Sequence, residues 1–240
     1  MTRPRRFALE SPPGTSAVAI VTGDELHHMR DVTRLAPGAR VELFDSSGVE
    51  YTGEIIRYER DRAEIRIESK MAREHPRIIL AAAIVKGPRM DFVVEKAAEL
   101  GASELWPIAS ARSLVRDPGD ERIARWGRLA LAAAKQSLAP SPMTIRAPLA
   151  FDDLIRAVPP ATLAIVCRQG ARPLGDVLGE MQPHTVLLAC GPEGDFAEAE
   201  LAAAAAAGFV SAGLGPNRLR SETAALAAVS IAAERMNRGA

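Results

Sequence analysis

The sequence predicts an α/β protein made of a small β-barrel followed by a parallel sheet with helices on both faces. The chain has 240 residues, 48% of them hydrophobic and 25% charged, as expected of a globular protein with a sizeable core. Up to about residue 72, apolar and polar side chains alternate, which is typical of strands with one solvated face. Beyond it, unbroken apolar runs alternate with segments of helical period. The predicted domains are therefore 1–72 and 73–240.

The first region has the pattern of a meander of short strands. Val41 and Leu43 fall on one strand face, and Ile65 and Ile67 fall in step on another. One helix is expected to interrupt the meander and to end before Pro37. The expected strands are 40–45, 49–59 and 63–69, with turns at 46–48 and 60–62 and a helix near 24–35.

The second region begins with an apolar run at 78–85 that contains no polar residue, as in a strand covered on both faces. Gly101 and Gly208 have the position of glycines that end helices. Strands that alternate with helices imply a parallel sheet. Further strands are expected at 104–109, 161–167, 185–190 and 209–215, and helices at 89–101, 121–138 (ending before Pro140), 197–208 and from about Ser221.

Loops rich in glycine, proline and charge follow four of these strands, and all should lie at the carboxyl edge of the sheet. Ligands bind at that edge in open parallel sheets. Glycine allows a ligand to approach the backbone closely, so a planar adenine ring could be held between two such loops. The sequence contains neither of the two common phosphate-binding motifs, Gly-x-x-x-x-Gly-Lys-Ser/Thr and Gly-x-Gly-x-x-Gly. This disfavours a nucleotide site that holds its ligand by the phosphates. The four loops are 86–89, 168–170, 191–195 and 216–220.

Two arginines stand immediately before the final helix. Ser221 is expected to cap this helix, and Glu222 suits the positive end of the helix dipole. Arg218 and Arg220 do not fit that explanation, because cations there are unfavourable by a few tenths of a kcal/mol. They make sense if an anion such as an RNA phosphate binds at this position.

Other basic residues suggest further contacts with phosphate. Lys86 and Arg89 flank a Gly-Pro turn and are candidates for phosphate binding. Arg3, Arg5 and Arg6 form a basic tip that fits either an RNA contact or an unstructured tail.

Composition excludes several other classes of protein. Net charge is zero, so the overall charge does not point to nucleic acid. Cys167 and Cys190 each end an apolar run, which predicts two buried thiols and no disulfide. His27 and His28 have no third ligand at a familiar spacing, so no metal is expected. No apolar stretch is long enough to span a bilayer, and the basic start lacks the apolar core of a secretion signal, so we expect a cytoplasmic protein.

Four segments together carry a resemblance to a known family. They are Gly-Pro-Glu-Gly after an apolar strand, Leu-Gly-x-x-x-Leu-Arg-x-Glu-Thr-Ala at the last helix, and the stretches 86–113 and 27–55. The chain resembles the bacterial 16S ribosomal RNA uridine N3-methyltransferases, of the SPOUT class of knotted methyltransferases. The similarity runs from about Arg5 to Ala233.

The resemblance implies a homodimer with a PUA-like RNA-binding barrel and S-adenosylmethionine bound in a trefoil knot. It implies methylation of uridine N3, with 16S ribosomal RNA or the 30S subunit as partner. Arg220 would face the reacting centre. From the chemistry of the reaction, we expect Glu222 to orient Arg220 or to relay the proton. The implied cofactor-binding residues are Leu188, Cys190, Gly191, Pro192, Glu193, Gly194, Leu214, Gly215, Pro216, Asn217 and Leu219. The implied RNA-binding residues are Arg3, Arg5, Arg6, Arg30, Lys86, Arg89, Lys135, Gln136 and Arg218.

The sequence departs from the family pattern at three places. Asp195 stands where the family often has a second glycine, and Pro88 replaces a more usual acidic residue. The segment around Lys135 and Gln136 lacks a following arginine, so one RNA contact could be absent or supplied by Lys135.

Two alternatives stay open at this point. The nearer one is another SPOUT enzyme that acts on transfer RNA or on a ribose hydroxyl. The other is an RNA-binding adaptor without activity, which would be expected to have decayed donor loops. The intact loops at 191–194 and 214–224 argue against the adaptor.

Overall fold

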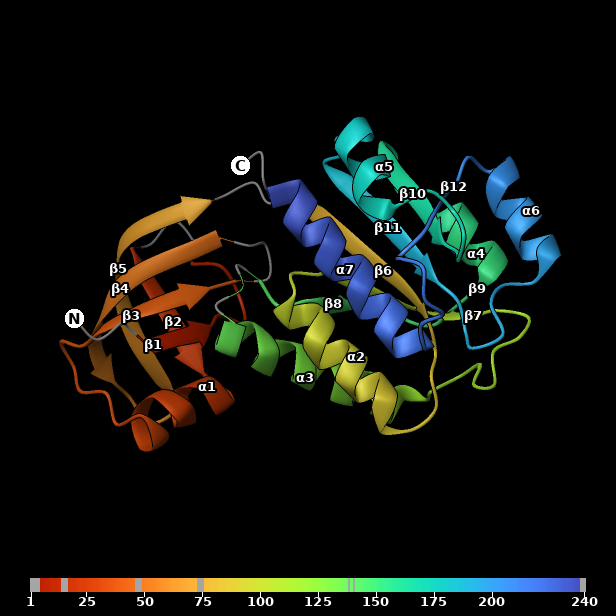
Figure 1. Ribbon diagram of the computed structural model, residues 1–240. Coiled ribbons are helices and arrows are strands. Elements are labelled where there is room, and N and C mark those ends of the chain that lie inside the picture. Colours follow the sequence, from red (N-terminus) through yellow and green to blue (C-terminus); the bar gives the residue numbers. More distant parts are fainter. Residues whose placement is uncertain are drawn as a thin grey trace. The chain divides into compact units, whose positions relative to one another are not determined.

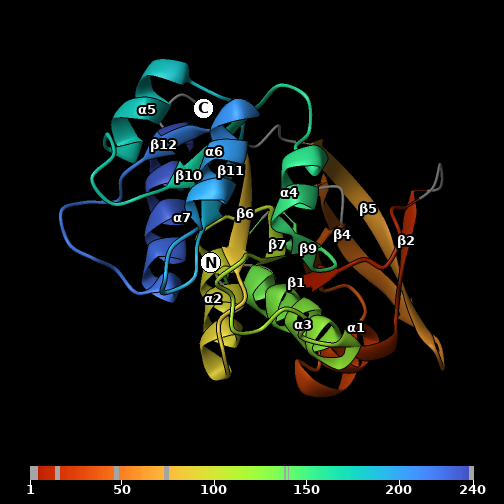
Figure 2. The same ribbon diagram turned by 90° about the vertical axis from the view of Figure 1, so that its right-hand side faces the viewer.

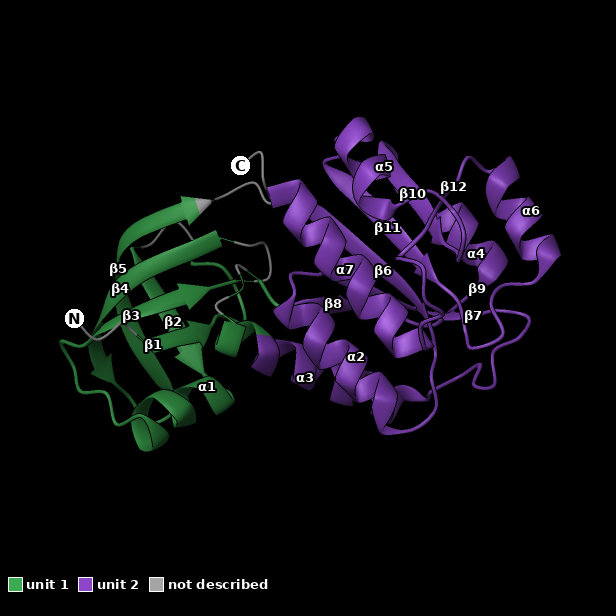
Figure 3. Ribbon diagram, viewed as in Figure 1, with its two compact units in different colours: residues 1–74, 134–142 green, residues 75–133, 143–240 purple. Residues whose placement is uncertain are grey.

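A computed structural model describes residues 5–13, 17–45, 49–72, 76–137, 139 and 141–237 (Figure 1). Arg3, Pro140 and the turn expected at 46–48 lie outside the described residues. The chain forms two compact units, one of Met1–Glu74 with Ala134–Pro142 and one of His75–Ala133 with Met143–Ala240 (Figure 3).

The first unit is built on a five-stranded mixed sheet around one apolar core. Strands β3, β4 and β5 form the antiparallel meander expected from the sequence, while β1 runs parallel to β3 and β2 antiparallel to β5. Phe7, Leu43, Ile55 and Ile65 are fully buried in this core. The sheet order is β1 (Arg5–Ala8), β3 (Arg40–Phe44), β4 (Val49–Tyr58), β5 (Arg62–Ala72), β2 (Val18–Thr22).

The helix expected near 24–35 is shorter and changes its winding. Helix α1 (Gly23–His27) continues into a π-helical turn, η1 (His28–Val32). Thr33 donates its backbone N–H to the carbonyl of His28 and its hydroxyl to the carbonyl of Met29. A side-chain hydroxyl that binds the preceding carbonyl competes with the regular α-helical ladder, which accounts for the early end.

A buried polar pair lies in the first unit. The Tyr51 hydroxyl donates to Asp45 Oδ2 at 2.9 Å, and both residues are at most 3% exposed. Burial, together with the hydrogen bond to this carboxylate, raises the pKa of Tyr51 to about 12.

The free energy of unfolding is expected to fall by about 2–3 kcal/mol as the pH rises from about 10 to about 12. The pKa of Tyr51 is higher in the folded than in the unfolded chain. Its contribution is therefore complete below the unfolded pKa and is lost as the pH rises through the folded one. Urea unfolding over this pH range measures the effect, and Tyr51→Phe should remove it. An equal fall in the variant would contradict the assignment to Tyr51.

The second unit contains the parallel sheet predicted from the alternating strands and helices. All its strand pairs are parallel. The order is β12 (Val210–Ala212), β10 (Thr162–Cys167), β11 (Thr185–Cys190), β6 (Arg77–Ala83), β7 (Glu104–Ala109), β8 (Thr144–Ile145), with β9 (Leu149–Ala150) beside β7.

Helices cover both faces of this sheet (Figures 1 and 2). On one face lie α2 (Pro88–Glu99), α3 (Asp120–Ser137), α5 (Leu174–Met181) and α7 (Ser221–Asn237). On the other lie α4 (Phe151–Ala157) and α6 (Glu198–Ala206). Trp126 and Trp106 are fully buried, one on each face. Alanines on the buried side of α7 let it approach α2 and α5 closely.

The last strand is shorter than expected, because Gly213 leaves β10 and instead forms a parallel bridge with Pro173. Strand β12 lies at the edge of the sheet, whereas α7 packs against β6 and β11. The connecting segment therefore crosses the carboxyl ends of β10 and β11. Gly213 N–H donates to the carbonyl of Arg172 at 2.7 Å, and its carbonyl accepts from Leu174 at 2.9 Å. This crossing places the segment before α7 over the carboxyl edge of the sheet.

Across the described residues, no helix is both long enough and apolar enough to cross a bilayer.

Candidate active site

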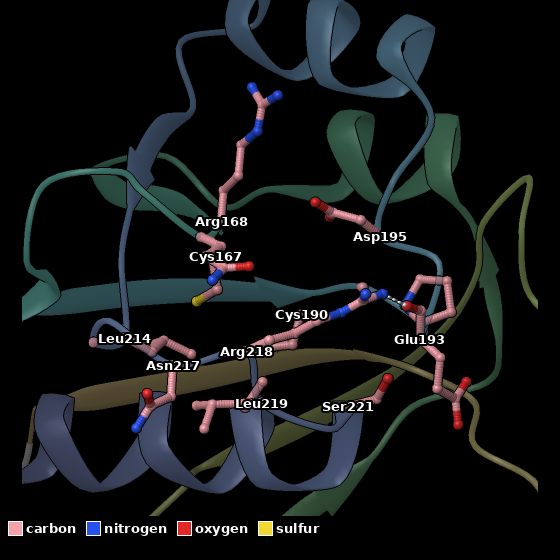
Figure 4. A pocket seen from close by; sticks show the side chains of 15 residues that line it. Cys167, Arg168, Cys190, Glu193, Asp195, Leu214, Asn217, Arg218, Leu219 and Ser221 are labelled. Atoms are coloured by element: carbon pink, nitrogen blue, oxygen red, sulfur yellow. Dashed lines mark hydrogen bonds between the residues drawn. The ribbon is translucent and has the colours of Figure 1, made fainter.

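A cavity lies at the carboxyl edge of the sheet, where the loops after β10, β11 and β12 meet (Figure 4). The sequence predicted that these loops would share an edge, and the cavity brings three of them together. Eight of the expected cofactor-binding residues line it: Cys190, Gly191, Pro192, Glu193, Leu214, Gly215, Asn217 and Leu219.

The other three expected residues do not line the cavity. Leu188 is buried in the core beneath it. Gly194 faces Arg112, whose Nη1 donates to the Gly194 carbonyl at 2.6 Å. Pro216 accepts a hydrogen bond from Gln169 Nε2 at 3.4 Å through its carbonyl. All three thus support the loops from outside the cavity.

Sequence reasoning missed several lining residues. Arg168, Gln169 and Asp195 belong to loops that the sequence placed at the ligand-binding edge, but they were not singled out as cofactor-binding residues. The missed residues are Cys167, Arg168, Gln169, Asp195, Ser221 and Ala224, while Arg218 was expected to bind RNA.

Asp195 explains the family's preference for glycine at its position. Its backbone has φ of 62°, a left-handed conformation that glycine adopts without cost and aspartate tolerates. The turn is held by Asp195 N–H donating to the Pro192 carbonyl at 2.9 Å, and Asp195 Oδ1 accepts from the Phe196 N–H at 2.7 Å. The departure from glycine therefore preserves the shape of the loop.

Two buried thiols lie at the floor of the cavity. Cys167 and Cys190 end neighbouring parallel strands and are 9% and 1% exposed, which confirms the prediction of buried thiols. A hydrogen bond with Cys167 and burial raise the pKa of Cys190 well above its usual value. The two buried thiols therefore suit an apolar part of a ligand.

Arg218 extends across the cavity toward the opposite loop (Figure 4). Its Nη2 donates to the Glu193 carbonyl at 3.1 Å. The Glu193 side chain in turn accepts from Arg89 Nη1 at 3.1 Å. Arg218 thus ties the loop after β12 to the loop after β11.

A second cavity lies beside the first, between the start of α2 and the start of α7. Its described lining residues are Pro88, Arg89, Phe92, Arg218, Leu219, Arg220, Glu222 and Thr223. Arg218 and Leu219 line both cavities. Arg220 is exposed here and has no ion pair or hydrogen bond from its side chain within the described chain.

The expected capping role of Ser221 is wrong. Ser221 is the first helical residue, its Oγ is buried, and it has no hydrogen-bond partner among the described residues. The next carboxylate, Glu222, lies with Oε2 3.6 Å from Arg89 Nη1, and no contact joins it to Arg220. The expectation that Glu222 orients Arg220 therefore finds no support.

The basic residues of the first unit differ in how much surface they offer. Arg5 is exposed on β1. The Arg6 side chain is 5% exposed, with Nη2 3.0 Å from Glu50 Oε1 and its guanidinium 4.5 Å from the Phe44 ring centre. Arg6 therefore packs the sheet and has little surface left for RNA, which sequence alone could not distinguish from Arg5.

Of the remaining residues expected to bind RNA, some already form ion pairs within the protein and others are exposed. Arg30 Nε donates to Asp31 Oδ1 at 3.1 Å, and Lys135 forms an ion pair with Glu25 inside the first unit. Gln136 is exposed on α3, and Lys86 is exposed after β6. No cluster of three metal-binding side chains occurs among the described residues.

The segment that returns before α7 thus borders a cavity that adjoins a second, arginine-lined cavity, at the sheet edge where open parallel sheets bind ligands. Residues 73–233 match the family described as RNA methyltransferase domain, and residues 21–68 match the RNA methyltransferase PUA domain. The chain belongs to the ribosomal RNA small subunit methyltransferase E family.

Relatives with that name cover nearly the whole chain. The Synechocystis protein is 30% identical over 89% of this chain and 72% of its own length. The Mycobacterium bovis protein is 30% identical over 93% of this chain and 88% of its own. A crystal structure of the Neisseria gonorrhoeae enzyme bound to S-adenosyl methionine is 30% identical, covers 95% and 96% of the two chains, and has a TM-score of 0.81.

Proposed function

We propose that this protein transfers a methyl group from S-adenosylmethionine to N3 of a specific uridine in 16S ribosomal RNA. The observation that carries the proposal is the pair of adjoining cavities at the carboxyl edge of the sheet. The first cavity is lined by glycine-containing loops that expose backbone groups, and the second is lined in part by arginine side chains. The names of the relatives and the donor bound in the gonococcal enzyme support the same activity.

The first cavity fits the donor chemically. Gly191 and Gly215 keep backbone groups accessible to an adenine ring, and the two buried thiols can contact an apolar part of the donor. Ser221 Oγ is a buried hydroxyl still without a partner among described residues, so it can bind a polar group of the ligand. We infer that Leu188, Gly194 and Pro216 support this cavity rather than contact the donor.

The bound donor supplies an activated methyl group on a sulfonium, so the protein mainly has to align the reactants. Holding two reactants in a near-attack geometry can supply about 7–11 kcal/mol of the barrier. Uracil N3 carries a proton at neutral pH, so its negative charge must be stabilised as it develops. Arg220, exposed and unpaired in the second cavity, supplies a guanidinium for a uracil carbonyl oxygen.

We propose that exposed basic and polar side chains hold the RNA. We propose Arg5, Lys86 and Gln136 as direct contacts, with Arg30 and Lys135 available once their ion pairs open. Helix α7 carries many small side chains, and we propose that it helps to form a homodimer. We also propose a cytoplasmic location, as expected of an enzyme that acts on ribosomal RNA.

Mass mapping of ribosomal RNA after incubation with enzyme and labelled donor tests the activity. We expect one labelled uridine in 16S RNA, with the methyl group on N3. Label on transfer RNA or on a ribose would contradict the proposal. Calorimetry with S-adenosylmethionine excludes an inactive adaptor if heat of binding is observed.

A further inference from the structure

Two consecutive residues at the start of α7 present buried oxygens that lack a hydrogen-bond partner. Ser221 Oγ and Glu222 Oε2 are both shielded from solvent and make no hydrogen bond within the described chain, although Glu222 Oε2 lies 3.6 Å from Arg89 Nη1. A buried polar atom without a hydrogen bond costs about 1–3 kcal/mol of stability. Such an atom is therefore a candidate to bind a ligand or a water molecule. Ser221 lines the first cavity and Glu222 lines the second. The start of α7 thus faces two ligand sites at once.

The second cavity combines three kinds of surface. Phe92 is 49% exposed, although large hydrophobic side chains usually pack inside. Arg89 and Arg220 supply hydrogen-bond donors, and Glu222 supplies an acceptor that is 12% exposed. These groups match a pyrimidine whose imide N–H lies between two carbonyl groups. The ring of Phe92 can stack on the base, the arginines can donate to its carbonyl oxygens, and Glu222 can accept from its N–H.

We propose that the second cavity binds the target uracil and that Glu222 is the proton acceptor of the reaction, with Phe92 as the stacking surface. This assignment rests on the proposed function. The Glu222 carboxylate accepts the N3–H hydrogen bond, while a guanidinium of the cavity donates to a carbonyl oxygen of the base. Cytosine has no proton on N3, so its lone pair would face the carboxylate, which gives uracil specificity.

The reaction balances with the groups present. The N3–H bond breaks, its proton passes to the Glu222 carboxylate, and the nitrogen lone pair forms the bond to the methyl carbon. The carbon–sulfur bond breaks, and its electron pair stays on sulfur, which becomes a neutral thioether. Protonated Glu222 then returns its proton to solvent. Arg89, whose Nη1 lies 3.6 Å from Glu222 Oε2, is a positioning residue that holds the carboxylate in place.

The decisive variant is Glu222→Gln, which keeps size and shape but cannot accept the proton. With ribosomal RNA as substrate, kcat should fall about 100-fold, while the Kd for S-adenosylmethionine stays within about twofold. The remaining activity should rise with pH, because solvent must remove the proton. RNA with 5-fluorouridine, whose N3–H is more acidic, should recover more activity in the variant than in the wild type. Glu180→Gln, an exposed carboxylate on α5, is the control.

Phe92→Ala tests the stacking surface separately. It should raise KM for RNA about tenfold with kcat and donor affinity little changed, and Phe92→Tyr should restore KM. A shift of solution mass to a smaller species in Phe92→Ala would overturn the stacking role, because the ring would then contact a second copy. If Glu222→Gln keeps near wild-type kcat and the same pH profile, the proton-acceptor assignment is wrong. Absence of transfer by the wild type would instead refute the proposed function.

Discussion

Arg220→Ala is expected to lower turnover by about 100-fold or more while the affinity for S-adenosylmethionine stays nearly unchanged. The side chain lines the second cavity and not the first, so donor contacts remain. Removing one donor that stabilises a developing anion typically costs 10²–10³ in kcat. Single-turnover methylation of 16S RNA, together with calorimetry of donor binding, separates the two effects.

We do not expect a loss of stability in Arg220→Ala to account for the lower turnover. The Arg220 side chain is exposed, and its contribution to α7 is the backbone carbonyl that accepts from Ala224 N–H at 2.8 Å, which alanine retains. Arg156→Ala removes a 71% exposed arginine from α4 and is the matched control. Arg220→Lys should recover part of the activity, since it keeps charge but loses the planar fork. If turnover in Arg220→Ala stays within about threefold of wild type, the proposed role is refuted.

Gly213→Ala should weaken donor binding by at least about tenfold and destabilise the second unit by about 1–3 kcal/mol. An added Cβ would lie 2.5 Å from the Ala171 carbonyl oxygen, closer than real contacts allow. Both atoms belong to backbone, so a segment of the crossing must move. Leu214, Gly215 and Asn217 follow directly and line the donor cavity, so the displacement reaches the site.

Thermal unfolding and calorimetric titration with S-adenosylmethionine measure both effects. Gly179→Ala is a matched control on α5, where an added Cβ meets nothing within 4 Å. Since glycine is a poor helix former, that variant should be more stable by about 0.5–1 kcal/mol and bind the donor normally. Unchanged stability and donor affinity in Gly213→Ala would show that the two segments do not cross as tightly as described.

Positive charge alone is a weak guide to RNA contacts in this protein. Arg6 and Arg5 are neighbours in the same basic tip, yet Arg6 is buried against Phe44 and paired with Glu50, while Arg5 is exposed. Arg218, expected to bind RNA, lines both cavities and also bridges two loops of the first one. Charge-reversal experiments on RNA affinity should therefore start with Arg5 and Lys86.

Local patterns determined the strands and helices that carry the site. The unbroken apolar run before Lys86 and the run that ends at Cys190 both form central parallel strands, because such runs need cover on two faces. The short elements 151–157 and 174–181 gave no comparable signal, since an α-helix of two turns contains too few residues to show a period. The resemblance of spaced motifs to a methyltransferase family added the activity, which periodicity could not supply.

Only the tertiary structure decided which loops meet and what each polar group faces. Strand β12 pairs with β10 rather than β11, and this order brings Arg168, Glu193 and Asn217 to one cavity. It also separates Ser221 from Glu222, placing adjacent residues in different sites. The physical reason is that sequence periodicity reports whether a segment is buried, whereas the choice of neighbours minimises the free energy of the whole packed sheet. That choice depends on contacts between residues far apart in the chain.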